Sequence, residues 1–452
     1  MKKYLTILFL FVTIIANCGN WMPLPKDVWY VRPSTGTYGT SDGTSYNNAF
    51  DGFADITWAN INAGDLLLCY GYFSNEVLTI GSSGSIGNPI KIKGINCTIN
   101  GAATQLSCID INNYDYITLE NFYLTNATTN GLICKGTATN IIGINIISEF
   151  SGNQAFQHLN TAQAVYYNCQ GNKNIDDGMS LHDATNVICY NSSFYGNADA
   201  FGGIADSRLV GYGITLEANT QTTMNVDAAT TDSSAKVILY NSKLILGSGL
   251  IDVQNKGYAE LWYCDITAST TTVVDVGGAS VAAKGYFKSN YCTYHGMAAT
   301  KGAIVARVGS VVTGRNNVFY GSGVKTGIGV TIINGGTFIG YNNIFSNLAI
   351  GVQVLAGGIA SSKNSCFYDN TANVTGTLIA TDSVITNPNF YSAINKQFWL
   401  TTGSSCENTG LNLGATYQMG LKNNSIWTNS INLLNQNSFG AGWEIGAYIY
   451  EP

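Results

Sequence analysis

The sequence predicts an all-β fold, a single-stranded right-handed parallel β-helix with a cap at each end. Three observations support this prediction. A phrase of strand-forming residues, an asparagine and further strand-forming residues recurs about every 24 residues, which fits one coil of three short strands and three turns. Glycine (51 residues) and tyrosine (27 residues) are frequent and only 11% of residues are charged, as in short strands joined by tight turns. No long segment has the periodicity of an amphipathic helix.

The recurring asparagines set the expected register of the coils. When Cys264 is counted in the series, successive members are 21–27 residues apart, except for one gap of 50 residues. That gap fits two coils, one of which has lost its asparagine. Asparagine tolerates the left-handed backbone region, and amides stacked about 4.8 Å apart can hydrogen-bond along the axis of the solenoid. We therefore interpret these residues as a structural ladder without a catalytic role: Asn121, Asn145, Asn168, Asn191, Asn241, Asn290, Asn317, Asn343 and Asn364, with Cys264 at the equivalent place.

The first twenty residues are expected to lie outside the fold. Residues 1–20 have the layout of a signal peptide, in which two lysines precede an apolar run over residues 4–15. The alternative is a lipoprotein signal, in which Cys18 becomes the lipidated first residue. Simple secretion is favoured because Asn17, rather than a small residue, precedes that cysteine. We therefore expect a secreted or cell-surface protein, and no later segment of the sequence is apolar enough to span a membrane.

The mature chain divides into three expected parts. Residues 21–84 form an N-terminal cap and the first coil, residues 85–384 form the β-helix, and residues 385–452 form a C-terminal coil and cap. Caps are expected because a stack of coils exposes an open apolar edge at each end.

The net charge and the cysteines indicate which kinds of partner and ligand to expect. The formal net charge is −6 and no basic stripe exists, which argues against a nucleic-acid partner. Of the 11 cysteines, ten remain after Cys18, and no CxxC pair occurs. Several lie in apolar, strand-like stretches, so we expect mostly free, buried thiols without a metal role.

Ionisable residues gather in one part of this charge-poor chain. The densest group is Lys173, Asp176, Asp177, His182 and Asp183, which is followed by Asp199, Asp206, Arg208 and Glu217. His182 is the one histidine of three that stands among carboxylates. The other two, His158 and His295, are expected to pack in the core and to sit in a turn before glycine, respectively.

Strand geometry predicts where these side chains point. Met179 and Leu181 should face the core, so Ser180 and His182 should face outward on the same strand. Asp177 and Asp199 are 22 residues apart, close to one coil, so their carboxylates should stack roughly 5 Å apart. Two carboxylates at that distance share a proton or bind a cation.

Several segments resemble the pectate-lyase-like β-helix superfamily. The opening segment, with INAGDLLLCYGYF, and the closing segment, with WEIGAYIY, resemble the ends of such proteins. NIDDG resembles the calcium-binding run of pectate lyases, with Asp176 and Asp177 in the places of the first two ligands. Ser180 replaces a third aspartate there, and Gly202-Gly203 occupy the place of the lysine base. Polygalacturonases carry a similar Asp-Asp pair, but the Gly-His-Gly that follows it in them is absent here. The run 178–183, GMSLHD, is similar to alginate C5-epimerases.

This resemblance implies a polysaccharide-active enzyme, most simply a lyase that removes the C5 proton of a uronic acid in an acidic polysaccharide. In that reading His182 is the base, with Asp177 or Asp183 orienting it. Lys173, Arg208 and Ser180 bind the substrate, and Ca²⁺ is held by Asp176, Asp177 and Asp199.

Two other functions stay open, and we expect a monomer in each case. One is a glycoside hydrolase of the polygalacturonase type, which would use Asp177 and Asp199 as acid and base. The other is a non-catalytic adhesin or carbohydrate-binding solenoid. Asp-Asp-Gly is also common in turns, where it needs no catalytic role.

Overall fold

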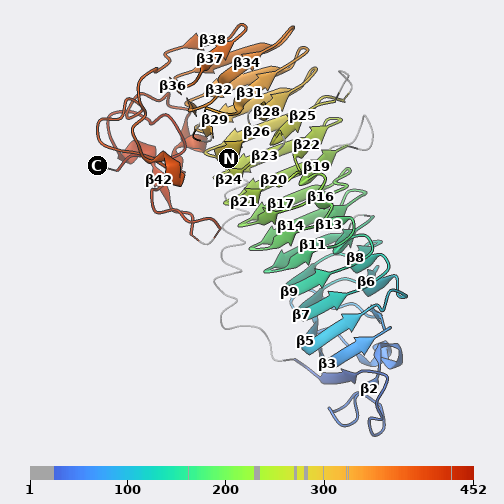
Figure 1. Ribbon diagram of the computed structural model, residues 1–452. Helices are drawn as coiled ribbons and strands as arrows, with labels where there is room; N and C mark the ends of the chain where they lie inside the picture. Colours follow the sequence, from blue (N-terminus) through green and yellow to red (C-terminus); the bar gives the residue numbers. More distant parts are fainter. Residues whose placement is uncertain are drawn as a thin grey trace.

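The fold is the predicted right-handed parallel β-helix, seen in a computed structural model that describes residues 25–160, 162–228, 235–268, 272–278, 283–298, 300–321, 323, 325–428 and 430–451. Its coils stack into one elongated solenoid (Figure 1). Residues 1–20, including Cys18, lie outside the described residues. Among the described residues, no helix is long and apolar enough to cross a membrane.

One face of the solenoid is a 13-stranded parallel sheet, here called sheet B. Its strands are β4 (Leu78–Thr79), β6 (Ser107–Asn112), β8 (Asn130–Lys135), β10 (Phe156–His158), β13 (Asp177–Leu181), β16 (Asp199–Gly202), β19 (Met224–Asp227), β22 (Ile251–Gln254), β25 (Val274–Val276), β28 (Gly302–Ala306), β31 (Ile328–Ile332), β34 (Ile350–Val354) and β37 (Ala372–Thr375).

The other faces belong to a 25-stranded sheet, here called sheet A, in which two rows of strands are joined through the long strands of the first coils. The first row is β1 (Val28–Arg32), β3 (Leu66–Ser74), β5 (Ile90–Asn100), β7 (Ile117–Thr125), β9 (Ile141–Glu149), β11 (Gln163–Tyr167), β14 (Asn186–Tyr190), β17 (Arg208–Tyr212), β20 (Lys236–Tyr240), β23 (Tyr258–Trp262), β26 (Tyr286–Asn290), β29 (Val311–Arg315), β32 (Thr337–Tyr341), β35 (Ile359–Lys363) and β38 (Ile379–Thr381), with β2 (Phe50–Asp51) beside β1. The second row is β12 (Gln170–Asn172), β15 (Ser193–Tyr195), β18 (Thr215–Glu217), β21 (Lys243–Ile245), β24 (Asp265–Thr267), β27 (Thr293–Met297), β30 (Val318–Gly321), β33 (Ile344–Ser346) and β36 (Cys366–Tyr368).

A left-handed residue bends each coil between these two rows. Asn121, Asn145 and Asn168 occupy this bend with φ of 62°, 52° and 53°. The expected amide ladder is present there, since Asn145 Nδ2 donates to Asn121 Oδ1 at 2.9 Å and Asn168 Nδ2 donates to Asn145 Oδ1 at 3.4 Å. Gly213, with φ of 65°, is the bend of the coil that lost its asparagine.

The expected register is wrong by one residue in several later coils. The left-handed positions there are Tyr263, Tyr291, Asn316 and Asn342, and not Cys264, Asn290, Asn317 and Asn343. The residue after the bend faces the interior, and a buried amide can satisfy backbone groups there. Asn317 and Asn343 do so, because Asn343 Oδ1 accepts from the backbone nitrogen of Asn317 at 3.1 Å.

The interior is one continuous apolar core that runs the length of the solenoid. All ten cysteines of the described residues are free and buried, as expected: Cys69, Cys97, Cys108, Cys134, Cys169, Cys189, Cys264, Cys292, Cys366 and Cys406. In the N-terminal segment, the 3-10 turns η1 (Phe53–Asp55) and η2 (Trp58–Asn60) precede β3, and the ring of Phe53 stacks on that of Phe73 at 3.9 Å.

The C-terminal segment folds back along the flank of the later coils (Figure 1). It contains β39 (Phe390–Ser392), η4 (Ala393–Asn395), β40 (Gln397–Leu400), η5 (Ala415–Tyr417), β41 (Met419–Leu421), β42 (Leu433–Asn435) and η6 (Gln436–Ser438). Trp427 Nε1 donates to the carbonyl of Tyr263 at 2.6 Å, and Gln436 Nε2 donates to the hydroxyl of Tyr291 at 2.7 Å. These bonds attach the segment to the bends of sheet A.

Candidate functional site

Two of the predicted site residues lie on the outer side at the end of β13, Ser180 within the strand and His182 directly after it. Met179 and Leu181 belong to the apolar core, as expected. Ser180 and His182 face away from it, and the Oγ of Ser180 lies 3.0 Å from Nε2 of His182. His182 is half-buried, whereas Ser180 is almost fully buried, so the imidazole is the more accessible of the two groups.

Asp177 joins them because the strand alternation is interrupted after it. Met179 lies in the core, and a Cβ added to Gly178 would also meet buried atoms of the neighbouring coil, so both residues face the interior. The carboxyl group of Asp177 therefore lies on the outer side, against Gly202, which is the register partner of Ser180. Asp177, Ser180 and His182 form one continuous series, which we call the β13 row.

Two glycines on the next coil provide space for this row. Gly202 is the register partner of Ser180, and a Cβ added there would overlap the carboxylate of Asp177. Gly203 has φ of 53°, and a Cβ there would lie 2.7 Å from Cε1 of His182. The sequence comparison placed these glycines where a lysine base would stand. In the structure they are instead what allows the β13 row to form.

The surroundings of Asp177 bring the pKa of its carboxyl group close to neutral pH. Burial raises the pKa of this carboxyl group to about 7, and the charges of Asp176 and Asp199 add to the rise. Hydrogen bonds from Ser180 and Gln154 act in the opposite direction. A carboxyl group with such a pKa is populated in both its protonated and ionised forms at physiological pH.

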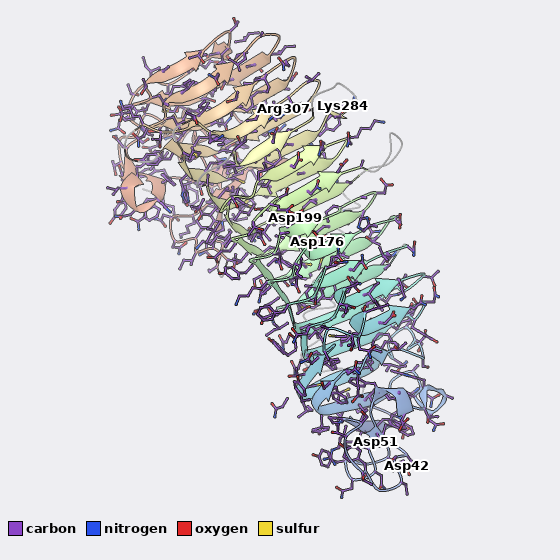
Figure 2. The ribbon with its side chains drawn as sticks, turned by 45° about the vertical axis from the view of Figure 1, so that its right-hand side comes forward. Asp42, Asp51, Asp176, Asp199, Lys284 and Arg307 are labelled. Atoms are coloured by element: carbon purple, nitrogen blue, oxygen red, sulfur yellow. The ribbon has the colours of Figure 1, made fainter. Side chains whose placement is uncertain are left out.

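The other two carboxylates of the predicted cluster belong to Asp199, which begins β16, and Asp176, which directly precedes β13. Asp177 and Asp199 are direct register partners on adjacent coils, as the spacing predicted. Asp199 Oδ1 accepts a hydrogen bond from the backbone nitrogen of Thr222 at 2.6 Å, and burial raises the pKa of Asp199 despite that bond. Asp176 is exposed, and its Oδ2 accepts from Gln154 Nε2 at 3.3 Å. Figure 2 shows Asp176 and Asp199 close together on one side of the solenoid.

A buried asparagine ladder fixes the turn that carries these carboxylates. Asn197 Oδ1 accepts from the backbone nitrogen and the Nδ2 of Asn174, at 2.9 and 3.0 Å. Asn219 Oδ1 accepts from the backbone nitrogen of Asn197 at 3.1 Å, and Asn197 Nδ2 donates to the carbonyl of Gly171 at 2.7 Å. This ladder was not among the asparagines selected from the sequence, although its members are 23 and 22 residues apart.

Three predicted residues are not brought into the β13 row. Arg208 begins β17 in sheet A, where its register partners are Asn186 and Lys236, so it lies on a different sheet from Asp177. Lys173 is exposed in the turn before β13, with its ammonium group 5.6 Å from the ring centroid of Phe150. Asp183 is exposed and has φ of 60°, in the turn after β13.

The other two histidines occupy different surroundings. His158 is buried, its Nε2 lies 3.0 Å from the hydroxyl of Tyr166, and burial lowers its pKa to about 3, which confirms that it packs in the core. His295 lies inside β27, where its Nε2 is 2.9 Å from Asp265 Oδ1. The prediction that His295 sits in a turn is therefore wrong.

Sequence reasoning missed the contribution of the preceding coil. Gln157 is the register partner of Ser180, and Asn130 Nδ2 donates to its Oε1 at 3.0 Å, which leaves its amide NH₂ group as a donor beside the row. Gln154 contacts the carboxylates as described above. The signal was available in the sequence, because Gln157 precedes Ser180 by 23 residues, one coil length.

A second polar group lies farther along sheet B. Asn225, Asp252 and Asp275 are successive register partners, and Arg307 binds both carboxylate oxygens of Asp275, at 2.5 and 2.6 Å. Burial raises the pKa of Asp252 to about 6, and the charges of Asp275 and Asp227 add to it. Figure 2 shows Arg307 several coils beyond Asp176 and Asp199. Polar side chains thus continue along this face beyond the β13 row.

Calcium binding by Asp176, Asp177 and Asp199 stays a prediction. In the described part of the chain, no group of three or more His, Cys, Asp or Glu side chains is placed to hold a metal ion. Asp176 accepts a hydrogen bond from Gln154, and Asp199 accepts one from the backbone nitrogen of Thr222.

The space above Gly202 gives a direct test of the site. We expect Gly202→Ala to displace the Asp177 carboxylate and to lower the rate of the reaction proposed below about 10- to 100-fold, because small misplacements of aligned groups have effects of that size. Steady-state rates measure the effect. Gly247→Ala is the control, since its Cβ would meet atoms only at ordinary contact distance, 3.7 Å or more. Full activity of Gly202→Ala would contradict the assigned geometry.

Comparisons with known proteins give structural likenesses only. No family model matches the chain, and no curated protein matches it. Among solved structures, it is similar to the pectate lyase Pel9A, at 15% identity over 94% of this chain and 97% of that one, with a TM-score of 0.43. It is also similar to an alginate lyase from Paenibacillus sp. str. FPU-7, at 12% identity over 79% and 99% of the two chains, with a TM-score of 0.38. A lacto-N-biosidase from Eubacterium ramulus matches at 10% identity over 79% and 68%, with a TM-score of 0.35.

Proposed function

We propose that the chain is an extracellular polysaccharide-cleaving enzyme that acts by β-elimination on a uronic-acid-containing polymer. The observation that carries this proposal is the β13 row, in which a half-buried imidazole, one hydroxyl and a buried carboxyl group follow one another along the outer side. Elimination requires a base of near-neutral pKa at the C5 proton, and histidine is the side chain suited to that role.

In this proposal the row orients the imidazole. Nε2 of His182 lies 3.0 Å from the Oγ of Ser180, and with the ring proton on Nε2 the neutral imidazole has an unprotonated Nδ1 that acts as the base. An ionised Asp177 stabilises the imidazolium that forms, acting through Ser180, and is therefore a positioning residue.

The elimination proceeds without any added reactant. His182 Nδ1 removes the C5 proton, the C4–C5 double bond forms and the bond from C4 to the glycosidic oxygen breaks. The imidazolium then returns the proton to the departing oxygen, which restores neutral His182. Gln157, on the preceding coil, supplies amide N–H groups for the substrate carboxylate, whose charge increases as the proton leaves.

Hydrolysis is the second candidate function, and one observation favours it. Asp177 and Asp199 are register partners, and burial raises the pKa of both carboxyl groups. A carboxylic acid next to a carboxylate is the pair that glycoside hydrolases use.

The test is a panel of uronic-acid polymers, assayed in parallel for unsaturated sugar ends by absorbance and for new reducing ends. We expect unsaturated ends from the wild-type protein and a loss of at least about 100-fold in kcat for His182→Ala. Tyr195→Ala is the control, because this exposed residue lies on β15 in sheet A. Reducing ends without the absorbance would establish hydrolysis instead. Binding without either product would establish a carbohydrate-binding protein.

A further inference from the structure

A cleft of about 650 Å³ lies where the C-terminal segment covers the later coils. Its floor is formed by the outer faces of β27, β30, β33 and β36, which carry His295, Tyr320 and Tyr368 in register. Its roof is residues 387–401, including Phe390. The cleft belongs to sheet A and begins five coils beyond β13, so it is separate from the β13 row.

His295 lines this cleft and is held in one orientation by its neighbours. It is 2% exposed, and its Nε2 lies 2.9 Å from Asp265 Oδ1. Thr293 also donates to Asp265 Oδ1, at 2.6 Å. The strand has an irregular register between His295 and Met297, where Gly296 adopts φ of 79°. Bulges of this kind are frequent beside functional sites because they redirect a side chain.

The second nitrogen of His295 lacks a partner. Nε2 donates to the Asp265 carboxylate. Nδ1 is buried and has no hydrogen-bond partner within the described residues. Buried polar groups in native proteins are nearly always satisfied, so this nitrogen calls for a partner that the described residues do not supply.

The remaining lining combines aromatic rings with polar groups. Tyr320, Tyr368 and Phe390 provide apolar surface, and Asn387 and Asn389 provide amides at the roof. Asp369 pairs with Lys325 at 2.5 Å and Asp265 contacts His295, while the exposed Lys396 adds an amino group at the roof. Apolar surface with several polar groups fits a ligand that has one apolar face and several hydroxyl groups.

We propose that this cleft is a second carbohydrate-binding site, which takes one or two units of a neutral glycan. A sugar hydroxyl lies beside His295, and the apolar face of the sugar ring lies against Tyr368. The volume suits such a ligand, because small-molecule sites measure about 300–1,000 Å³. This proposal does not depend on the reaction proposed for the β13 row.

The three histidines of the chain allow the two sites to be tested in one experiment. Imidazole resonances are recorded by NMR during titration with neutral tetrasaccharides built from glucose, galactose, mannose or xylose. We expect at least one of these sugars to shift the His295 resonances, while those of the buried His158 stay fixed. The same titration on His182→Ala should give the same His295 shift, which separates this site from the β13 row.

Variants of the cleft test the sugar contact itself. Tyr368→Ala should weaken binding at least about 10-fold, whereas Tyr368→Phe, which keeps the ring, should bind within about threefold of wild type. Tyr391→Ala is the matched control, since this tyrosine is 62% exposed and stacks on Trp399 outside the cleft lining. Absence of any His295 shift across the four sugars, or unchanged affinity in Tyr368→Ala, would overturn the proposal.

Discussion

Asp177→Asn is expected to make the protein more stable at pH 8, by about 3 kcal/mol, while it lowers the rate of polysaccharide cleavage. Burial raises the pKa of Asp177 from 3.8 to about 7. Ionising this group in the folded protein therefore costs about 4 kcal/mol relative to the unfolded chain. The asparagine variant avoids this cost, but its amide makes weaker hydrogen bonds, which offsets about 1 kcal/mol of the gain in stability. The rate falls because a neutral amide cannot stabilise the imidazolium of His182.

The pH dependence has a definite sign. Between pH 4 and pH 7 the folded protein keeps a proton on Asp177 that the unfolded chain has released, so the free energy of unfolding decreases as pH rises through this window. Below pH 4 both states are protonated, and above pH 7 both are ionised, so the contribution is constant there. Asp252, with a pKa raised to about 6, adds a similar slope, and the difference between wild type and Asp177→Asn isolates the contribution of Asp177.

Urea unfolding at pH 4, 5, 6, 7 and 8 measures this effect. We expect the two proteins to have similar stability at pH 4 and to diverge as pH rises. Asp183→Asn removes a charge from the exposed neighbouring turn and should change the free energy of unfolding by less than about 0.5 kcal/mol. Parallel stability curves for Asp177→Asn and wild type would mean that the carboxyl group is not buried as described.

The fold was predictable because its signals are local and periodic. The spacing of Asn121, Asn145 and Asn168 gave the coil length, and the same spacing placed Asp177 beside Asp199. The outward position of Ser180 and His182 followed from alternation against the apolar Met179 and Leu181. Each of these inferences needed only neighbours in the strand or one coil away.

The parts that were missed depend on departures from the period or on distant segments. The interruption of alternation at Gly178 depends on the packing of buried side chains, which no pattern along the strand reveals. The position of Arg208 on sheet A could not be predicted, because its number of residues from Asp177 does not say on which sheet a strand begins. The surroundings of His295 include a segment that follows it by about 100 residues, so its role required the folded chain.

The largest loss of stability is expected from Asn197→Ala. Asn197 is fully buried and satisfies three groups: the backbone nitrogen and Nδ2 of Asn174, and the carbonyl of Gly171. Alanine leaves all three buried without these partners, and each unsatisfied group costs roughly 1–3 kcal/mol, partly relieved by relaxation. We expect the free energy of unfolding to fall by about 4 kcal/mol, measured by urea unfolding at pH 7.

Two further variants separate hydrogen bonding from the simple loss of side-chain atoms. Asn186→Ala removes an exposed amide whose Nδ2 makes one weak contact, with the carbonyl of Ala184 at 3.4 Å, and should change stability by less than about 0.5 kcal/mol. Asn197→Asp keeps the acceptor but loses the donor to Gly171, so it should lie between alanine and wild type. A loss of less than 1 kcal/mol in Asn197→Ala would show that the ladder does not fix the turn. Asp177 and Asp199 begin β13 and β16 beside this ladder, and Asp176 directly precedes β13. A weakened turn would therefore also displace these carboxylates, and the rate of cleavage should fall in parallel with stability.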